Sequence, residues 1–453
     1  MPKPLPSIPE RNQLIPRKAL FMPHLLKKVR GVFDKIEDHR IGKVSYPLTD
    51  VLMSGLAVFS LKYSSLLSFD DAQNDPIIRA NLRQLYGVID APCDTQLRDV
   101  LDPISPESLR PAVVDVIQTL QQHGALADYH YLGGYLVSID GTGQFSSNHT
   151  SCSECCEKHH SDGTIEYYHQ LLASVIVHPD KATVLPLFCE PIIKQDGATK
   201  NDCERNAGKR LLPALRAGFP RMKMIVLEDS LAANGPHIQT LIENNMSYII
   251  RAKSGTNASL MAYVQQKMCA GKTEEFEVYD KAQKITRGYR FINDAPLNKT
   301  YPDVRVNYLD YWEVDEHGNQ KNFMWITDIT LSRDNVYHVM QAGRSRWKVE
   351  NETFNTLKNL GYHFEHNYGH GKQHLATIFA LLTMLAFLLD QVQEHSCNLF
   401  NAARHKFHSK IAFWAKIRGM FTEHYIDDWE TFYMAIIYGH KGKKLSPDYP
   451  DTS

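Results

Sequence analysis

The pattern of hydrophobic and polar positions changes character twice along this chain of 453 residues. Over residues 44–122, apolar residues recur at intervals of three and four, as in Val51–Phe59, and this spacing predicts amphipathic helices. From Tyr131 the pattern favours β-strands, and helical spacing returns only at Arg333. The pattern therefore predicts a helical N-terminal region, a strand-containing centre and a helical C-terminal part.

The strand-containing centre has a distinctive order of elements. Three strands, a helix, a strand, a helix and a strand form the order of an RNase H-like core, in which helices cover both faces of a mixed sheet. Residues 252–330 are polar and strand-prone, so we expect a β-rich insertion there. The predicted fold class is α/β: an RNase H-like mixed sheet core with a helical N-terminal region, a β-rich insertion and a helical C-terminus. The predicted regions are 1–130 (helical), 131–251 (first part of the core), 252–330 (insertion), 331–392 (remaining core helices) and 393–453 (basic, helical).

The overall charge argues weakly against a nucleic-acid partner, but two segments of the chain are locally basic. A formal net charge of −1 predicts no general attraction to DNA. However, residues 1–31 carry seven Lys or Arg against the single acid Glu10, and residues 401–420 carry five with no acid. These segments could hold phosphates locally or could simply be solvated surface.

Nothing in the sequence predicts export or a membrane span. Met1–Pro9 lacks the charged-then-apolar layout of a signal peptide, so we expect a cytoplasmic protein. The eight cysteines are then expected to be reduced thiols. The longest apolar run, Leu375–Leu389, is shorter than the roughly twenty residues of a bilayer span. We interpret it as a buried core helix.

Three carboxylates stand at positions that could serve metal chemistry. Asp140 and Asp229 each follow an apolar run of strand type, and Glu350 lies in a predicted helix that also carries Arg346. Each aspartate alone would suit a turn or a helix cap. Together the three side chains could hold a pair of divalent cations for phosphoryl transfer on nucleic acid.

At these residues the chain resembles the DDE transposases of bacterial insertion sequences, particularly those with a strand-rich insertion between the second aspartate and the glutamate. The resemblance covers about residues 135–391. It implies that Asp140, Asp229 and Glu350 bind two Mg²⁺ ions, and that the enzyme cuts DNA at insertion-sequence ends and transfers the strands to target DNA. It also implies a homodimer on DNA. The motifs are Ile139–Thr142, Leu227–Asp229 and Arg346–Asn351.

The resemblance also assigns a role to the first region and to two cations. Residues 1–130 would bind the DNA ends, although they could equally be a packing subdomain. Arg346 and Lys358 would bind DNA phosphates, the arginine through two parallel hydrogen bonds.

The sequence departs from the family pattern at two positions near Glu350. Many relatives have Tyr three residues before the arginine and Lys seven residues after the glutamate, whereas here these positions are Gly343 and Leu357. Lys358 is eight residues after Glu350, which in a regular helix turns it away by roughly 80°.

Glu352 would be the third carboxylate if the register were set from Lys358. We favour Glu350 because Arg346, four residues earlier, falls on the same helix face.

A cluster of soft ligands follows the first core strand. Cys152, Cys155, Cys156 and His159 could bind a structural zinc ion, with His169, Cys189 or Cys203 completing the shell. Free thiols and redox chemistry are the alternatives. A second histidine-rich segment, Gly361–His374, could contact DNA, bind a metal or form packed turns.

Two other functions remain compatible with the same residues. One is an RNase H-like metal-dependent nuclease that cuts without strand transfer, and the other is a DNA-binding protein with a decayed active site. No Walker-type glycine loop is present in the sequence, so we expect no nucleotide cofactor.

Overall fold

The computed structural model describes residues 14–193 and 203–439, which form two compact units. Unit 1 comprises Met1–Ala125, Gln144–Tyr168 and Asn355–Ser453, and unit 2 comprises Leu126–Gly143 and His169–Phe354. The boundary passes through two unbroken strands, β2 and β4, and through one continuous helical stretch. The five regions predicted from the sequence stay a prediction, because these units join segments that are distant in the chain.

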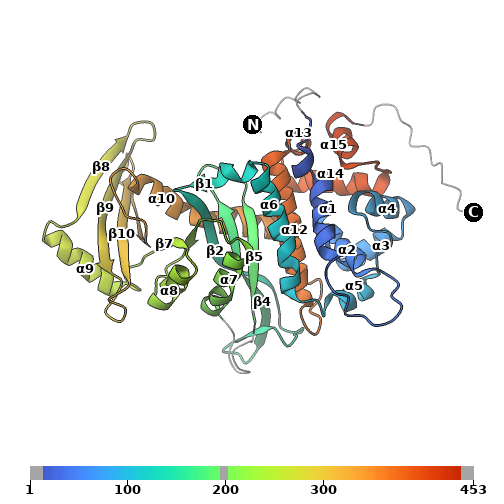
Figure 1. Cartoon of the computed structure of the whole chain (residues 1–453), viewed down its shortest axis with the longest axis horizontal. Helices are drawn as coiled ribbons and strands as arrows, with labels where there is room; N and C mark the ends of the chain where they lie inside the picture. The colour runs from blue at the N-terminus through green and yellow to red at the C-terminus, as the bar shows by residue number, and fades with distance from the viewer. Residues whose placement is uncertain (1–13, 194–202, 440–453) are drawn as a thin grey trace, which may run out of the picture. The chain divides into compact units, whose positions relative to one another are not determined.

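Unit 1 is a helical assembly around one long apolar helix, α12 (Leu375–Ser396), which packs against α2, α6 and α1 (Figure 1). By length and composition α12 could cross a membrane, yet 94% of its most apolar window is buried inside the protein. The prediction of a buried core helix at this position is therefore confirmed. The other helices of unit 1 are α1 (Met22–Phe33), α2 (Leu48–Ser60), α3 (Leu66–Gln73), α4 (Pro76–Asn81), α5 (Asp94–Leu101), α6 (Arg110–Gln122), α11 (Asn355–Asn359), α13 (Asn398–His405), α14 (Lys410–Glu423) and α15 (Trp429–Tyr438).

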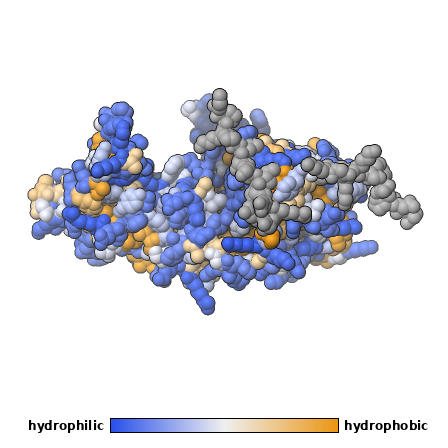
Figure 2. Space-filling model, turned by 90° about the horizontal axis from the view of Figure 1, so that it is seen from above, coloured by the Kyte–Doolittle hydropathy of each residue, from blue (hydrophilic) through white to orange (hydrophobic). Residues whose placement is uncertain are grey.

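The helices of unit 1 begin and pack as their sequences require. Ser65 and Ser68 form a reciprocal capping box at the start of α3, and Ser409 accepts a backbone hydrogen bond at the start of α14. Every residue of α2 is buried, in keeping with its apolar composition. The face drawn in Figure 2 is mostly hydrophilic, with hydrophobic residues scattered over it.

Unit 2 contains most of a mixed sheet whose core strands lie in the order β5-β4-β2-β6-β7. The first three strands along the chain are neighbours, and β6 and β7 then add in parallel to β2. This is the strand order of an RNase H-like core, so the predicted fold class is confirmed. The strands and helices of this core are β1 (His130–Tyr131), β2 (Gly134–Ser147), β4 (Ile165–Val177), β5 (Leu185–Ile192), α7 (Glu204–Gly218), β6 (Met224–Glu228), α8 (Gly235–Glu243), β7 (Ser247–Arg251) and α10 (Val336–Arg344). The short strand β3 (Cys156–His159) belongs to unit 1 and pairs with the start of β4.

The predicted insertion is present and continues the core sheet. Its four antiparallel strands end in β11, which pairs directly with β7, as Ile326 opposite Ile250 shows. One helix, α9 (Ala258–Cys269), lies against β9, so the insertion is not purely strand (Figure 1). The strands are β8 (Glu274–Asp280), β9 (Ile285–Pro296), β10 (Arg305–Val314) and β11 (Gln320–Thr327).

The first core strand is longer than the sequence pattern indicated. We expected a strand end at Asp140, but β2 continues to Ser147 through Gly141, Thr142 and Gly143. The small residues resemble a turn in sequence, yet hydrogen bonding to neighbouring strands keeps them extended. Asp140 therefore lies within a strand, at the level where the shorter parallel strand β6 ends.

Candidate active site

The two aspartates stand close to the end of the pairing between two adjacent parallel strands, Asp140 within β2 and Asp229 directly after β6. Ser138 of β2 is in register with Leu227 of β6, and two residues later along the chain in each case stand Asp140 and Asp229. Neighbouring strands lie about 4.8 Å apart. The pairing thus brings the backbone of both aspartates to the end of β6, where Asp229 Oδ1 accepts a hydrogen bond from the backbone N–H of Leu231 at 2.8 Å.

Arg346 joins Asp140 to Glu350. One guanidinium nitrogen donates to Asp140 Oδ2 at 2.7 Å, and the other donates to Glu350 Oε1 at 2.8 Å. The hydroxyl of Ser138 donates to the carbonyl oxygen of Arg346 at 2.7 Å, which ties this turn to β2. The structure therefore gathers Asp140, Glu350 and Arg346 in one hydrogen-bonded group.

The two joined carboxyl groups differ in proton affinity. Burial, together with a hydrogen bond to Glu350, raises the pKa of Asp140 to about 7. Burial also acts to raise the pKa of Glu350, but hydrogen bonds from Arg346 and Asp140 outweigh it, and the pKa of Glu350 lies below its usual value. Crowded carboxylates of this kind favour either a shared proton or a cation.

Glu352, the alternative third carboxylate, is directed elsewhere. Its charge raises the proton affinity of Lys348, although burial has the larger and opposite effect and lowers the pKa of Lys348 overall. The ammonium group of Lys348 also donates to the carbonyl oxygen of Pro179 at 2.9 Å. The carboxylate that shares Arg346 with Asp140 is that of Glu350.

A fourth carboxylate, Glu204 at the start of α7, belongs to the same neighbourhood and was missed from the sequence. Its Oε1 atom lies 2.2 Å from the position that a Cβ atom would take at Gly141, so a larger residue there would have to displace the Glu204 carboxylate. Burial, and then the charges of Asp229 and Glu228, raise the pKa of Glu204. An acid in the first turn of a helix is ordinary in sequence, which is why the pattern gave no signal.

The helix that carries Glu350 contains a π-helical segment, Val349–Phe354, followed without a break by α11. A π-turn accommodates one extra residue. The spacing rule of a regular helix, from which the roughly 80° offset of Lys358 was predicted, therefore does not apply across this segment. Lys358 lies in unit 1, where its ammonium group pairs with Glu365 at 2.8 Å.

The tyrosine position of the family pattern is filled by a different side chain. A Cβ atom at Gly343 would stand 2.4 Å from the indole Nε1 of Trp325, a residue of β11 that is 2% exposed. Trp325 in turn stacks on Phe323 with a ring-centroid distance of 5.8 Å. The glycine in α10 is thus required by a tryptophan that the insertion supplies.

Replacing Gly343 by Ala is expected to destabilise the protein by about 1–3 kcal/mol, because the methyl group must displace the packed indole of Trp325. The free energy of unfolding in urea measures this loss. Gly255→Ala is the matched control, since a Cβ atom at this exposed glycine meets nothing within 4 Å. Equal stability of the two variants would contradict the packing described for Trp325.

A small pocket of about 170 Å³ adjoins Arg346. It combines cationic and aromatic side chains, which suit phosphate groups and unpaired bases. The guanidinium groups of Arg344 and Arg251 stand over the Phe323 ring at 5.0 and 5.6 Å. The pocket is lined by Arg251, Phe323, Trp325, Gly343, Arg344, Arg346 and Trp347.

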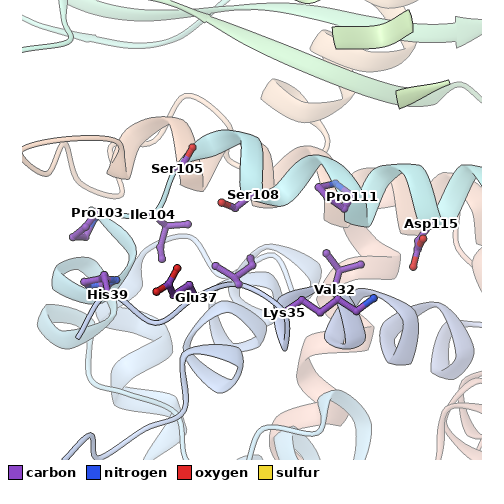
Figure 3. Close-up of a pocket in the computed structure, with 11 residues that line it drawn as sticks. Val32, Lys35, Glu37, His39, Pro103, Ile104, Ser105, Ser108, Pro111 and Asp115 are labelled. Atoms are coloured by element: carbon purple, nitrogen blue, oxygen red, sulfur yellow. The ribbon is translucent and has the colours of Figure 1, made fainter. Parts of the chain in front are cut away.

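A larger pocket of about 420 Å³ lies within unit 1 (Figure 3). Its charged lining mixes Lys35 with Glu37 and Asp115, together with His39. The mixed charge gives no preference for an anionic ligand, and none of the three predicted catalytic carboxylates lines it.

The basic C-terminal segment is largely occupied by contacts within unit 1. Arg404, Lys406 and Arg418 donate to backbone carbonyl oxygens, and Lys410 pairs with Glu394 at 2.9 Å. These cations would have to break their present hydrogen bonds and ion pair before they could bind phosphates. The expectation that this segment holds DNA therefore loses support.

Part of the predicted soft-ligand cluster is assembled. The Sγ atoms of Cys152 and Cys155 lie 3.6 Å apart, and Cys155 Sγ lies 3.6 Å from Nδ1 of His370. Of the three residues proposed to complete the shell, His169 belongs to this group among the described residues, whereas Cys189 and Cys203 stand outside it. His370 comes from the histidine-rich segment that the sequence left open.

The other two predicted zinc ligands need correction. Cys156 begins β3 and pairs with Tyr168 of β4, which turns it into the sheet. His159 stands at the other end of β3 with 69% of its side chain exposed, and its Nε2 atom is 3.4 Å from Glu157. Neither residue belongs to the group of ligand atoms formed by Cys152, Cys155, His169 and His370.

A family model described as the transposase DDE domain matches residues 150–388, which include Asp229 and Glu350 and begin after Asp140. Among solved structures, a cryo-EM structure of the piggyBac transposase synaptic complex with hairpin DNA is similar, with 12% sequence identity and a TM-score of 0.42, covering 96% of this chain and 86% of that chain. A search of curated proteins finds no match.

Proposed function

Because the chain belongs to the DDE transposase family, we propose that Asp140, Asp229 and Glu350 bind two Mg²⁺ ions and support DNA cleavage at the ends of an insertion sequence and strand transfer into target DNA. The observation that carries the proposal is Arg346, which holds Glu350 beside Asp140, together with the position of Asp229 directly after β6, the strand that pairs with β2. Carboxylate oxygens are the hard ligands that Mg²⁺ prefers.

The donor set suits a two-metal site. Bound Mg²⁺ would stabilise the attacking and leaving oxygens of an in-line displacement. Asp140 must give up the proton that burial favours. Arg346 would be released to bind the phosphate of the scissile strand only when Mg²⁺ takes its place as the cation between Asp140 and Glu350. Glu204 supplies a further carboxylate near Asp229 and would accept a hydrogen bond from an attacking water molecule.

DNA contacts are proposed around the small pocket of unit 2. Arg251, Arg344 and Arg346 would bind phosphates, and Trp347, 53% exposed, offers a ring on which a base could stack. Lys358 would bind a further phosphate, as the family pattern implies. Cutting and joining two ends implies a homodimer on DNA, and we propose a cytoplasmic location.

A nuclease without strand transfer would use the same carboxylates, and a protein with a decayed site would retain only DNA binding. The packing of Trp325 over Gly343 favours an intact site, because it compensates for a departure from the family pattern.

The direct test is an incubation of the purified chain with Mg²⁺ and a supercoiled plasmid that carries the DNA flanking its coding sequence. We expect breaks at the element ends and joined products in a second, target plasmid. Breaks without joined products would assign the nuclease instead. Binding without breaks would assign the decayed protein.

Arg346→Lys is expected to lower cleavage about 10²-fold, because lysine keeps the charge but cannot bind two carboxylates or a phosphate through a planar fork. Single-turnover cleavage rates measure the effect. Arg333→Lys serves as the control, since Arg333 makes an exposed pair with Glu274 at 3.4 Å in the insertion. Full activity of Arg346→Lys would mean that the bidentate contact has no role.

A further inference from the structure

We propose that Cys152, Cys155, His169 and His370 form a structural zinc site, a role independent of the proposed DNA chemistry. Their ligand atoms all lie within 4.8 Å of one another. The side chains come from a turn after β2, from β4 and from the segment before α12. His169 directly follows Tyr168 in the unbroken strand β4, so this strand places it beside the turn.

The distances between the ligand atoms match tetrahedral coordination. With Zn–S near 2.3 Å and Zn–N near 2.0–2.1 Å, tetrahedral angles separate two sulfurs by about 3.8 Å and a sulfur from a nitrogen by about 3.6 Å. The observed separations are 3.6 Å between Cys152 Sγ and Cys155 Sγ and 3.6 Å between Cys155 Sγ and His370 Nδ1. A disulfide would need about 2.05 Å.

The cysteine turn is already shaped for a metal. The backbone N–H of Cys155 donates to the carbonyl oxygen of Cys152 at 3.2 Å, which closes a tight turn. The backbone N–H of Cys152 donates to Cys155 Sγ at 3.3 Å. Hydrogen bonds to ligand sulfurs orient them and stabilise thiolate character.

Two side-chain contacts join this turn to the segment that carries His370. The hydroxyl of Ser153 donates to the carbonyl oxygen of Lys372 at 3.3 Å. The carboxylate of Glu154 lies 2.9 Å from Nδ1 of His374. Segments more than two hundred residues apart in the chain are therefore held in contact on both sides of the ligand group.

The His370 segment is fixed independently by Asp102, a buried aspartate that follows α5. Its carboxylate accepts from the backbone N–H groups of Lys372, Gln373 and Leu375 at 2.7, 3.0 and 3.1 Å. Gly371 has a φ of +67°, and a Cβ atom there would stand 2.1 Å from Asp102. The position of His370 is therefore fixed before zinc binds, and binding does not require the ordering of a free loop.

The ligand chemistry favours zinc and a structural role. Two sulfurs and two imidazole nitrogens are soft and borderline ligands, which select zinc over Mg²⁺. Cys155, His169 and His370 are 1%, 3% and 8% exposed. Four buried or half-buried protein ligands leave no open position for a substrate, so the ion would join three segments of chain and perform no chemistry itself.

The test is the zinc content of the full chain, purified without chelators and measured by plasma mass spectrometry. We expect about one zinc per chain in the wild type and a drop of about tenfold in Cys155→Ser and in His370→Asn. Cys269→Ser and His159→Asn are matched controls, because both residues are exposed and stand outside the ligand group. They are expected to retain the metal.

A second measurement covers the case in which the ligand variants fail to fold. X-ray absorption of the wild-type protein is expected to show two sulfur and two nitrogen neighbours around zinc. Absence of zinc from the wild type, or full zinc in Cys155→Ser and His370→Asn, overturns the proposal. Free thiols can also be counted in the denatured, unreduced chain, which has eight cysteines. A count of six would indicate a disulfide and would overturn the proposal. None of these results depends on DNA cleavage.

Discussion

Asp140→Asn is expected to lower Mg²⁺-dependent DNA cleavage by about 10³-fold or more, equivalent to ~4 kcal/mol of transition-state stabilisation. The substitution removes one anionic ligand and leaves the shape of the strand unchanged. The fold should persist, because burial already raises the pKa of Asp140 to about 7, so the metal-free protein tolerates a neutral side chain there. Single-turnover cleavage rates measure the loss.

Binding of Mn²⁺ in the presence of a DNA duplex, followed by calorimetry, separates loss of metal from other causes. Asp140→Asn, Asp229→Asn and Glu350→Gln are expected to weaken binding, whereas Glu352→Gln is the matched control on the same helical segment. Normal binding by Glu350→Gln would remove Glu350 from the site, and loss in Glu352→Gln alone would put Glu352 there. Normal cleavage by Asp140→Asn would refute the carboxylate assignment.

Lys62→Met is expected to destabilise unit 1 by about 3–5 kcal/mol, because it leaves Asp390 buried without its ammonium partner. Lys62 is 1% exposed, and its Nζ atom donates to Asp390 Oδ2 at 2.5 Å. The ammonium group also stands 4.3 and 4.0 Å from the ring centroids of Tyr362 and Trp414. Burial lowers the pKa of Lys62 and raises that of Asp390, so neither charge is stable there alone.

The free energy of unfolding in urea tests this effect against two controls. Lys284→Met removes an exposed pair with Glu316 and should cost less than about 1 kcal/mol. Adding Asp390→Asn to Lys62→Met removes the buried charge and still accepts a hydrogen bond from the Tyr362 hydroxyl, so stability should partly return. A Lys62→Met variant as stable as Lys284→Met would show that the buried pair contributes little.

The order of core elements was predictable because the local pattern of apolar residues indicates each strand and helix. Apolar runs gave the strands that end at Glu228 and Arg251, and the spacing from Leu375 gave the buried helix. The pairing of Arg346 with Glu350 was also local, since residues four apart share a helix face. These features need no knowledge of distant parts of the chain.

The features that escaped prediction depend on contacts between distant segments. No spacing rule connects Gly343 to Trp325, or His370 to Cys155, because the chain between them must fold first. The length of β2 escaped because Gly141 and its small neighbours look like a turn until adjacent strands pair with them. Glu204 escaped for the same reason, since its closeness to Gly141 is purely tertiary.

The pairing of β11 with β7 restricts where the insertion can change during evolution or in the laboratory. If the four insertion strands were cut out, β7 would become an edge, with a row of backbone N–H and C=O groups open to other chains. Changes in length are far better tolerated at the opposite side, where β8 is the last strand. The turn between Asp280 and Ile285 is therefore the natural place to graft a label or an affinity tag.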